Sequence, residues 1–296
     1  MMQCVNESRK AAGRAWGVRV AAIATSLTGL LCLGCTQPQP PEPVPVTPPP
    51  TPYREEAYRA IPRPEPVRRP PEVPIRTVRV GRSQAGREMT MTIFGSSDRP
   101  VFIFGAIHGD EPAGAVVASR LIDELRRDVA PCRTCPVAIL PVANPDGLAA
   151  GKRTNARGVD LNRNFPARNW VKSKPDNRNY GGASAGSEVE TKALIRTIDQ
   201  LKPRLIITIH AISRGRQCNN YDGPGAEVGR AMAAHNGYPV KASIGYPTPG
   251  SFGSWAGIDR KIPVITLELP AGTSGEACWK QNREALLAAI RQSGSS

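Results

Sequence analysis

Aromatic residues are scarce in this chain of 296 residues: they make up 5% of the sequence, and no segment of it is rich in lysine and arginine. Proteins that bind nucleic acid commonly stack bases on aromatic rings and hold phosphates with basic clusters. We therefore expect no nucleic-acid partner. With 40% hydrophobic and 22% charged residues the chain can bury a core of ordinary size, which excludes wholesale disorder.

Acidic residues are too few to balance the basic ones, with 25 Asp and Glu against 39 Lys and Arg and a formal charge of +14. Residues 1–35 contribute +3 and residues 36–75 contribute nothing, so an excess of +11 lies on residues 76–296. A basic body favours anionic partners in general, and it does not choose among nucleic acid, anionic lipid and a carboxylate-rich substrate.

The apolar run from Ala21 to Leu33 is too short to cross a bilayer comfortably. It follows a basic stretch and ends in Leu33-Gly34-Cys35, which is typical of an export signal. The ending resembles a bacterial lipoprotein signal, in which Cys35 becomes the lipidated first residue. A signal that is simply cleaved and an uncleaved anchor helix are the alternatives. We expect an exported protein of the periplasm or cell envelope, tethered to the membrane by its lipid.

Proline is concentrated in one segment, since 15 of the 30 prolines lie between Thr36 and Ile75. Proline fixes φ and removes backbone donors, so this segment favours a semi-rigid polyproline spacer over a folded core. The sequence therefore predicts three parts: a signal (residues 1–35), a spacer (residues 36–75) and one folded domain (residues 76–296).

Seven cysteines occur, and four of them lie in the predicted domain: Cys132, Cys135, Cys218 and Cys278. An exported domain makes disulfides plausible. Cys132-Arg-Thr-Cys135 has the spacing of a metal knuckle, but no second pair at that spacing exists. Structural disulfides or plain buried thiols are the two expectations.

Apolar β-branched runs alternate with helical patterns along the domain, which predicts an α/β fold with a largely parallel sheet. Functional sites of such sheets gather at the carboxyl ends of the strands. The predicted strands are residues 77–80, 89–94, 100–105, 137–142, 205–209 and 264–267. The predicted helices are residues 112–127, one that starts at the capping box Ser187-Glu-Val-Glu190, 226–235 and 274–290.

Only three histidines occur, and two of them stand where predicted buried strands end. His108 is followed at i+3 by Glu111, and His210 ends a strand about a hundred residues later. Two imidazoles and a carboxylate are a ligand set that suits zinc with one position open for water. The alternative is that each histidine is an ordinary core or loop residue. His235 is expected at a helix end and is not a candidate ligand.

Further motifs give this set its context: Asn144-Pro-Asp-Gly147, Gly158-Val-Asp-Leu-Asn-Arg-Asn-Phe165 and Leu267-Glu-Leu269. Together with His108-Gly-Asp-Glu111 and His210 they occur in the order found in the zinc metallocarboxypeptidases, which the chain resembles from about residue 75 to residue 290. The resemblance implies a three-layer α/β/α fold around a mixed, largely parallel sheet. It is closest to a compact bacterial branch whose members cut the γ-D-glutamyl bond to diaminopimelate in murein peptides.

The resemblance implies a role for each matching residue. His108, Glu111 and His210 correspond to the ligands of one zinc ion per chain, and Glu268 corresponds to the general base. A carboxylate beside zinc suits this role, since zinc lowers the pKa of water to about 7 and the carboxylate can then take the proton. Asp160 corresponds to the carboxylate that orients the first histidine.

Four more residues correspond to groups that touch substrate. Arg153 is the candidate electrophile for a developing oxyanion. Asn162 and Arg163 match the pair that grips the terminal carboxylate, a task to which a planar guanidinium is suited. Tyr246 matches a mobile tyrosine that closes over substrate.

Two features depart from the large digestive enzymes of the family. Asp110 stands where they carry an arginine, and the domain lacks the insertions that shape their specificity pocket. Arg214 and Arg216, just after His210, are candidates for a second carboxylate of diaminopimelate, with a solvated basic loop as the alternative.

The sequence thus predicts an exported zinc amidohydrolase that cleaves murein peptides, with a peptide bearing a free carboxylate as substrate. Three alternatives remain open: a zinc carboxypeptidase of broader specificity, a deacylase of N-acyl amino acids, and a non-catalytic lipoprotein that binds the cell wall.

Overall fold

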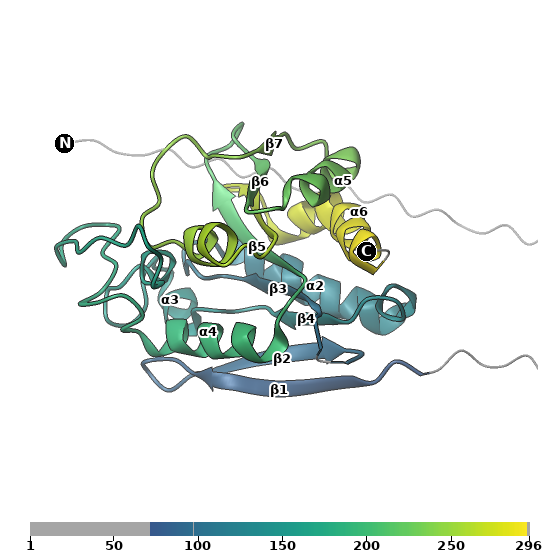
Figure 1. Ribbon diagram of the computed structural model, residues 1–296, viewed down its shortest axis with the longest axis horizontal. Helices are drawn as coiled ribbons and strands as arrows, with labels where there is room; N and C mark the ends of the chain where they lie inside the picture. Colours follow the sequence, from purple (N-terminus) through teal and green to yellow (C-terminus); the bar gives the residue numbers. More distant parts are fainter. Residues whose placement is uncertain (1–71, 97, 295–296) are drawn as a thin grey trace, which may run out of the picture. The chain divides into compact units, whose positions relative to one another are not determined.

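The computed structural model of the protein describes residues 72–96 and 98–294 (Figure 1). The predicted signal segment with Cys35, and nearly all of the predicted spacer, lie outside these residues. Within them, no helix combines the length and apolar character needed to cross a membrane. The first strand begins at Ile75, one residue before the predicted start of the catalytic domain.

One eight-stranded sheet forms the centre of the domain, in the order β1-β2-β4-β3-β5-β8-β6-β7. The strands are β1 (Ile75–Arg82), β2 (Glu88–Phe94), β3 (Val101–Gly105), β4 (Val137–Leu140), β5 (Leu205–Ile212), β6 (Cys218–Asp222), β7 (Val240–Lys241) and β8 (Val264–Pro270). The central strands β4, β3, β5 and β8 are parallel. Antiparallel pairing occurs towards the edges, at β1/β2, β2/β4 and β6/β8. The predicted mixed sheet is confirmed.

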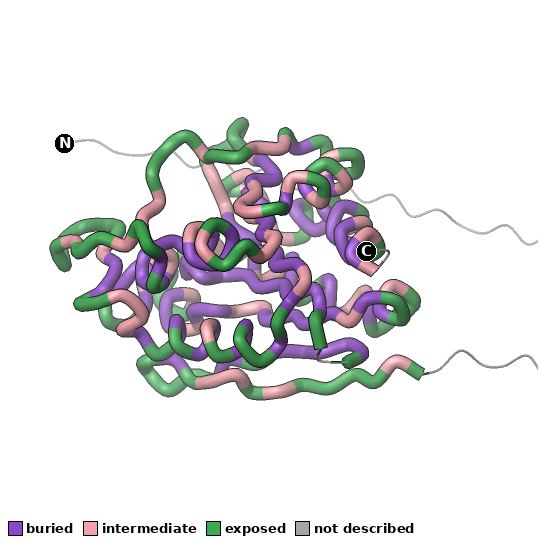
Figure 2. Tube along the Cα trace, in the orientation of Figure 1, coloured by how far each residue is buried: buried purple, intermediate pink, exposed green. Residues whose placement is uncertain are grey.

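Helices cover both faces of this sheet and give it the three layers of an α/β/α fold (Figure 1). On one face lie α2 (Pro112–Arg127), α5 (Ala226–Asn236) and α6 (Gly275–Gly294). On the other lie α4 (Val189–Leu201) and η3 (Gly253–Asp259). β3 shows why both faces are covered: Val101 and Ile103 belong to the first core, and the alternating Phe102 and Phe104 belong to the second. Figure 2 shows the resulting continuous burial of the central strands.

The short elements η1 (Ala130–Cys132), α3 (Pro145–Ala150) and η2 (Leu161–Arg163) lie in predicted loops, and β6, β7 and η3 were not predicted either. β6 has the sequence Cys-Asn-Asn-Tyr-Asp, which lacks an apolar β pattern. Its burial instead rests on side-chain hydrogen bonds, such as that from Asn219 Nδ2 to Asn236 Oδ1 at 3.1 Å. Tertiary context supplies these partners, and local sequence does not show them.

The predicted capping box at the start of α4 is wrong. The N-cap residue is Glu188, not Ser187, and the Ser187 hydroxyl donates to the Glu188 carboxylate at 2.6 Å. The Glu190 carboxylate accepts instead from the backbone of Gln84 and from Asn155 Nδ2. A tertiary contact with the turn between β1 and β2 has therefore replaced the local cap.

The four cysteines of the domain are all free and buried, so of the two expectations the thiols are right and the disulfides are wrong. Burial raises the pKa of Cys132 to about 12 and that of Cys218 to about 11. Such thiols remain protonated at neutral pH and behave as small apolar side chains.

Candidate functional site

The candidate site lies at the carboxyl ends of three parallel strands, β3, β5 and β8. The chain leaves β3 at Gly105 and reaches His108 three residues later, while His210 and Glu268 face each other as register partners on β5 and β8. β5 and β8 extend further than predicted, to Ile212 and Pro270, so His210 lies within its strand and does not end it. The strands thus fix the backbones of both residues.

The loop after β3 is held by the Asn144-Pro-Asp-Gly147 motif. Asn144 Nδ2 donates to the carbonyl of Ile107 at 3.1 Å, and Asn144 Oδ1 accepts from the backbone of Gly147 at 2.9 Å. A Cβ on Gly109 would lie 1.9 Å from the carbonyl carbon of Gly147, so only glycine permits this approach. The motif therefore positions the loop that carries His108.

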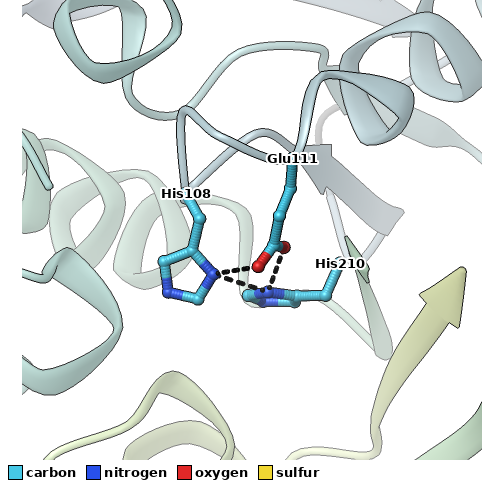
Figure 3. Close-up of side chains that lie close together, drawn as sticks. All are labelled: His108, Glu111 and His210. Atoms are coloured by element: carbon cyan, nitrogen blue, oxygen red, sulfur yellow. Dashed lines mark hydrogen bonds and ion pairs between the residues drawn. The ribbon is translucent and has the colours of Figure 1, made fainter. Parts of the chain in front are cut away.

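Figure 3 shows that His108, Glu111 and His210 point towards one another. His108 Nδ1 lies 2.9 Å from Glu111 Oε1 and 3.2 Å from His210 Nδ1, and His210 Nδ1 lies 3.2 Å from Glu111 Oε2. Donor atoms of these three residues all lie within 4.8 Å of one another, close enough to share a metal ion. Tetrahedral ligands with bonds of about 2.0–2.1 Å are separated by roughly 3.3 Å. The nitrogen and oxygen donors thus fit zinc in both chemistry and spacing.

The carboxylates of Glu111 and Asp160 favour a positive charge on the neighbouring imidazole of His108. Burial alone disfavours a charged imidazole, but Glu111 and Asp160 outweigh it and raise the pKa of His108 to about 9. Burial likewise disfavours charge on Glu111, yet the two histidines hold the pKa of that carboxyl well below its ordinary value. Glu111 Oε2 also accepts from the backbone of Ala211 at 2.9 Å, which fixes the carboxylate.

Asp160 lies behind the first histidine, where the sequence placed it. Its Oδ1 is 3.1 Å from His108 Nε2, the ring nitrogen that faces away from the other two ligands, and it also accepts from the backbone of Asn162 at 2.9 Å. Such a contact fixes the tautomer and orientation of a ligating imidazole. Asp160 is fully buried, and its partners hold its pKa far below the ordinary range despite that burial.

Glu268 is buried, with 6% of its surface exposed, and it lines the same cavity as the three ligands. Burial raises its pKa, and the neighbouring Glu111 carboxylate adds to the effect, while His210 and Arg153 oppose it. A carboxylate with a raised pKa beside a cation site is suited to accept a proton and to return it.

Arg153 is held by two carboxylates. Its Nε donates to Asp160 Oδ2 at 3.0 Å, and its Nη1 lies 3.5 Å from Glu111 Oε1. The side chain lines the same cavity as the ligand cluster, where a fixed cation can stabilise a developing oxyanion.

Asn162 and Arg163 also line the cavity, and the surrounding backbone fixes both. Asn162 Oδ1 accepts from the backbone of Phe252 at 2.8 Å, and among the described residues its Nδ2 has no hydrogen-bond partner, which leaves it as the free donor. Arg163 Nη1 donates to the carbonyl of Asn162 at 2.7 Å, and the carbonyl of Arg163 is packed between Gly181 and Gly250. The contact with Phe252 was not predicted, since a backbone donor ninety residues away leaves no local signal.

The cavity that these residues line has a volume of about 930 Å³, which suits a peptide of a few residues. Tyr246 lies at its rim and is 48% exposed. Asp110, Arg178, Asn179 and Thr248 also line it, as does the chain from residue 270 to residue 275. Of these, Arg178, Asn179 and the 270–275 segment were not predicted as site residues, because no motif marks the loops that hold Arg178 and Asn179 or the connection from β8 to α6.

Of the remaining sequence candidates, one lies at the cavity and two do not. Arg216 lines the cavity, and Arg214, two residues earlier, does not. His235 lies in the last turn of α5, before the left-handed Gly237, and is not part of the ligand cluster, as expected.

Comparison with known proteins agrees with this geometry. A family model described as zinc carboxypeptidase matches residues 70–217. Murein peptide amidase A of Escherichia coli K12 is 36% identical over 193 residues, which cover 60% of this chain and 74% of that protein. The protein of the same name from Vibrio campbellii is 28% identical over 208 residues, covering 66% and 79%.

Solved structures share the fold. The murein-tripeptide amidase of Escherichia coli O157 superposes with a TM-score of 0.58 at 29% identity, over 75% of this chain and 92% of that one. Carboxypeptidase A from Helicoverpa armigera superposes with a TM-score of 0.63 at 22% identity, over 75% and 69%, which is a likeness of fold alone.

Proposed function

Because the chain belongs to the zinc carboxypeptidase family and is a zinc-dependent hydrolytic enzyme of peptides, we propose that it cleaves murein peptides at the γ-D-glutamyl bond to diaminopimelate. One observation carries the proposal: the His108, Glu111 and His210 cluster lies in the same cavity as Glu268 and the Asn162–Arg163 pair. The similarity to murein peptide amidases supplies the substrate class.

The three clustered side chains would hold the zinc ion, and two of them are held by residues outside the cluster. Asp160 supports His108, and the backbone of Ala211 supports Glu111. Zinc held here supplies Lewis acidity, which polarises a carbonyl and lowers the pKa of water to about 7.

Substrate binding falls to residues on the cavity wall. The Arg163 guanidinium and the free Asn162 Nδ2 bind the terminal carboxylate of the peptide, which sets the distance from that carboxylate to the bond that is cleaved. Tyr246, exposed at the rim, closes over the bound residue and excludes water.

Glu268 carries the proton. Its carboxylate takes a proton from the attacking water and returns it to the leaving amine of diaminopimelate. The Arg153 guanidinium, fixed by Asp160 and Glu111, stabilises the negative charge that develops on the carbonyl oxygen.

The location of the enzyme is part of the proposal and rests on the sequence alone. The basic stretch, the short apolar run and Cys35 favour an exported lipoprotein of the cell envelope, with residues 36–75 as a spacer. The mass of the mature N-terminus tests this: a lipid on Cys35 that is absent in Cys35→Ser supports the proposal, and an unmodified N-terminus at another residue contradicts it.

Mass spectrometry of the products tests the function. The zinc-loaded full-length protein is incubated with L-Ala-γ-D-Glu-meso-diaminopimelate, and free diaminopimelate with L-Ala-D-Glu is expected. An intact tripeptide, or release of alanine, contradicts the proposal. Faster release of C-terminal residues from ordinary α-linked dipeptides supports the carboxypeptidase of broader specificity, and cleavage of N-acyl amino acids alone supports the deacylase.

A further inference from the structure

Arg216 lies in the turn that joins β5 to β6, and this turn passes the carboxyl end of β8, which lies between those two strands. Cys218 and Glu268 are register partners on β6 and β8. Arg216 precedes Cys218 by two residues, in the turn that leads into β6 beside Glu268, so it lies near the end of the sheet that holds the site. Its side chain lines the cavity.

The Arg216 side chain is exposed, as that of Arg214 is, and one hydrogen bond holds its guanidinium without neutralising the charge. Its Nη2 donates to the carbonyl of Ile244 at 2.8 Å, and it forms no ion pair within residues 72–96 and 98–294. Arg153, by contrast, is paired with Asp160 and Glu111. The Arg216 charge therefore stays available to a ligand in the cavity.

Arg163 and Arg216 line the same cavity. Arg216 Nη2 donates to the carbonyl of Ile244, two residues before Tyr246, and both Ile244 and Tyr246 line that cavity as well. A substrate residue whose terminal carboxylate is bound by Arg163 therefore lies in the cavity that Arg216 also lines.

We infer that Arg216 is a specificity-determining residue, which binds a carboxylate in the side chain of the C-terminal substrate residue. The inference rests on the proposed function and deepens it, because diaminopimelate carries such a carboxylate. Lysine has the same ammonium-bearing side chain without it. A guanidinium held in place binds a carboxylate through charge-assisted hydrogen bonds, and its loss is felt only by the substrate that has the second carboxylate.

Two tripeptides test this, one ending in meso-diaminopimelate and one ending in L-lysine, with Arg216→Met as the variant. The wild-type full-length protein is expected to prefer the diaminopimelate peptide about 10- to 100-fold in kcat/KM, as one charge-assisted contact gives. In Arg216→Met the preference disappears while kcat/KM for the lysine peptide is unchanged.

Arg214→Met is the matched control, since Arg214 lies in the same turn, is exposed and does not line the cavity. It should retain the wild-type preference. Arg216→Lys keeps the charge and should retain part of it. If Arg216 acted only by holding the Ile244 carbonyl, Arg216→Met would slow both peptides equally, and this result would overturn the inference.

A binding measurement separates this inference from the proposed function. Calorimetry of the zinc-loaded full-length protein with free meso-diaminopimelate and free lysine needs no turnover. Tighter binding of diaminopimelate by the wild type, lost in Arg216→Met, supports the role of Arg216 even if neither tripeptide is cleaved. Equal binding of the two amino acids by the wild type overturns it.

Discussion

Among single residues, Asp160 connects three different parts of the site. Its carboxylate reaches His108 Nε2, Arg153 Nε and the backbone of Asn162, so one buried side chain links a zinc ligand, the candidate electrophile and the carboxylate-binding pair. Its neighbours favour the charged form strongly enough to hold its pKa far below the ordinary range. Asp160 thus orients these groups through its charge, although it does not itself line the cavity.

Asp160→Asn should weaken zinc binding about 10- to 100-fold, because an amide fixes the His108 tautomer less well than a carboxylate does. Competition with a chromogenic chelator measures this affinity. Asp110→Asn serves as the control, since the Asp110 side chain lines the cavity and forms no hydrogen bond or ion pair with the ligands in the described part of the chain. Equal zinc affinities of Asp160→Asn and the wild type would rule out the positioning role.

At the scale of elements, close backbone packing fixes the carboxylate-binding pair. A Cβ on Gly181 would lie 2.4 Å from the carbonyl oxygen of Arg163. Gly181→Ala should therefore displace Arg163 and raise KM about tenfold or more, with zinc content unchanged. Gly86→Ala, in the open turn between β1 and β2, introduces only backbone strain and should leave KM as it is. Steady-state kinetics decides, and an unchanged KM in Gly181→Ala would contradict the packing argument.

Asp222, at the end of β6, makes the free energy of unfolding depend on pH. Its carboxylate packs against Gly253 of η3, without a hydrogen bond or ion pair to the described residues, and burial raises its pKa to about 6. Since the ordinary pKa of an unfolded Asp is about 3.9, ionisation destabilises the native state fully above pH 6. This penalty, at most about 3 kcal/mol, disappears as the pH falls from about 6 to about 4.

Asp222→Asn should accordingly increase the free energy of unfolding at pH 7.5 and have little effect at pH 4. Urea denaturation at the two pH values measures the difference, with Asp176→Asn, on an exposed loop, as the control. A loss of stability at pH 7.5 would show that the Asp222 carboxylate has a stabilising partner.

At the scale of the whole molecule, zinc links segments that are far apart in the chain. Its ligands come from the loop after β3 and from β5, a hundred residues later. An ion that binds only the folded state at a hundred times its Kd stabilises by about 2.7 kcal/mol. Chelation should therefore lower Tm by roughly 5–10 °C. Calorimetry of the wild type and Glu111→Gln measures the shift, which should be absent in the variant; an equal shift in both would place the ion elsewhere.

The sequence predicted most of the central layers, since apolar β-branched strands such as Leu205–Ile209 and the amphipathic α2 carry their patterns locally. It also brought His108, Glu111 and His210 together, because strand ends of a parallel sheet share an edge. Prediction from the sequence failed where the hydrogen-bond partner of a residue lies far away in the chain. β6 is buried through Asn219 and Asn236, and the expected cap at Ser187 gave way to contacts of Glu190 with another loop. The position of Arg178 at the cavity and the contact of Phe252 with Asn162 depend likewise on how distant segments meet.

The central claim is that this chain hydrolyses murein peptide with Glu268 as its base. The most direct test is kcat of the wild type and of Glu268→Gln on L-Ala-γ-D-Glu-meso-diaminopimelate, with one zinc per chain verified in both. We expect the variant to bind zinc as the wild type does and to lose activity about 10²- to 10⁴-fold. A Glu268→Gln enzyme that keeps more than a tenth of the wild-type kcat, or a zinc-loaded wild type that leaves this peptide intact, would contradict the claim.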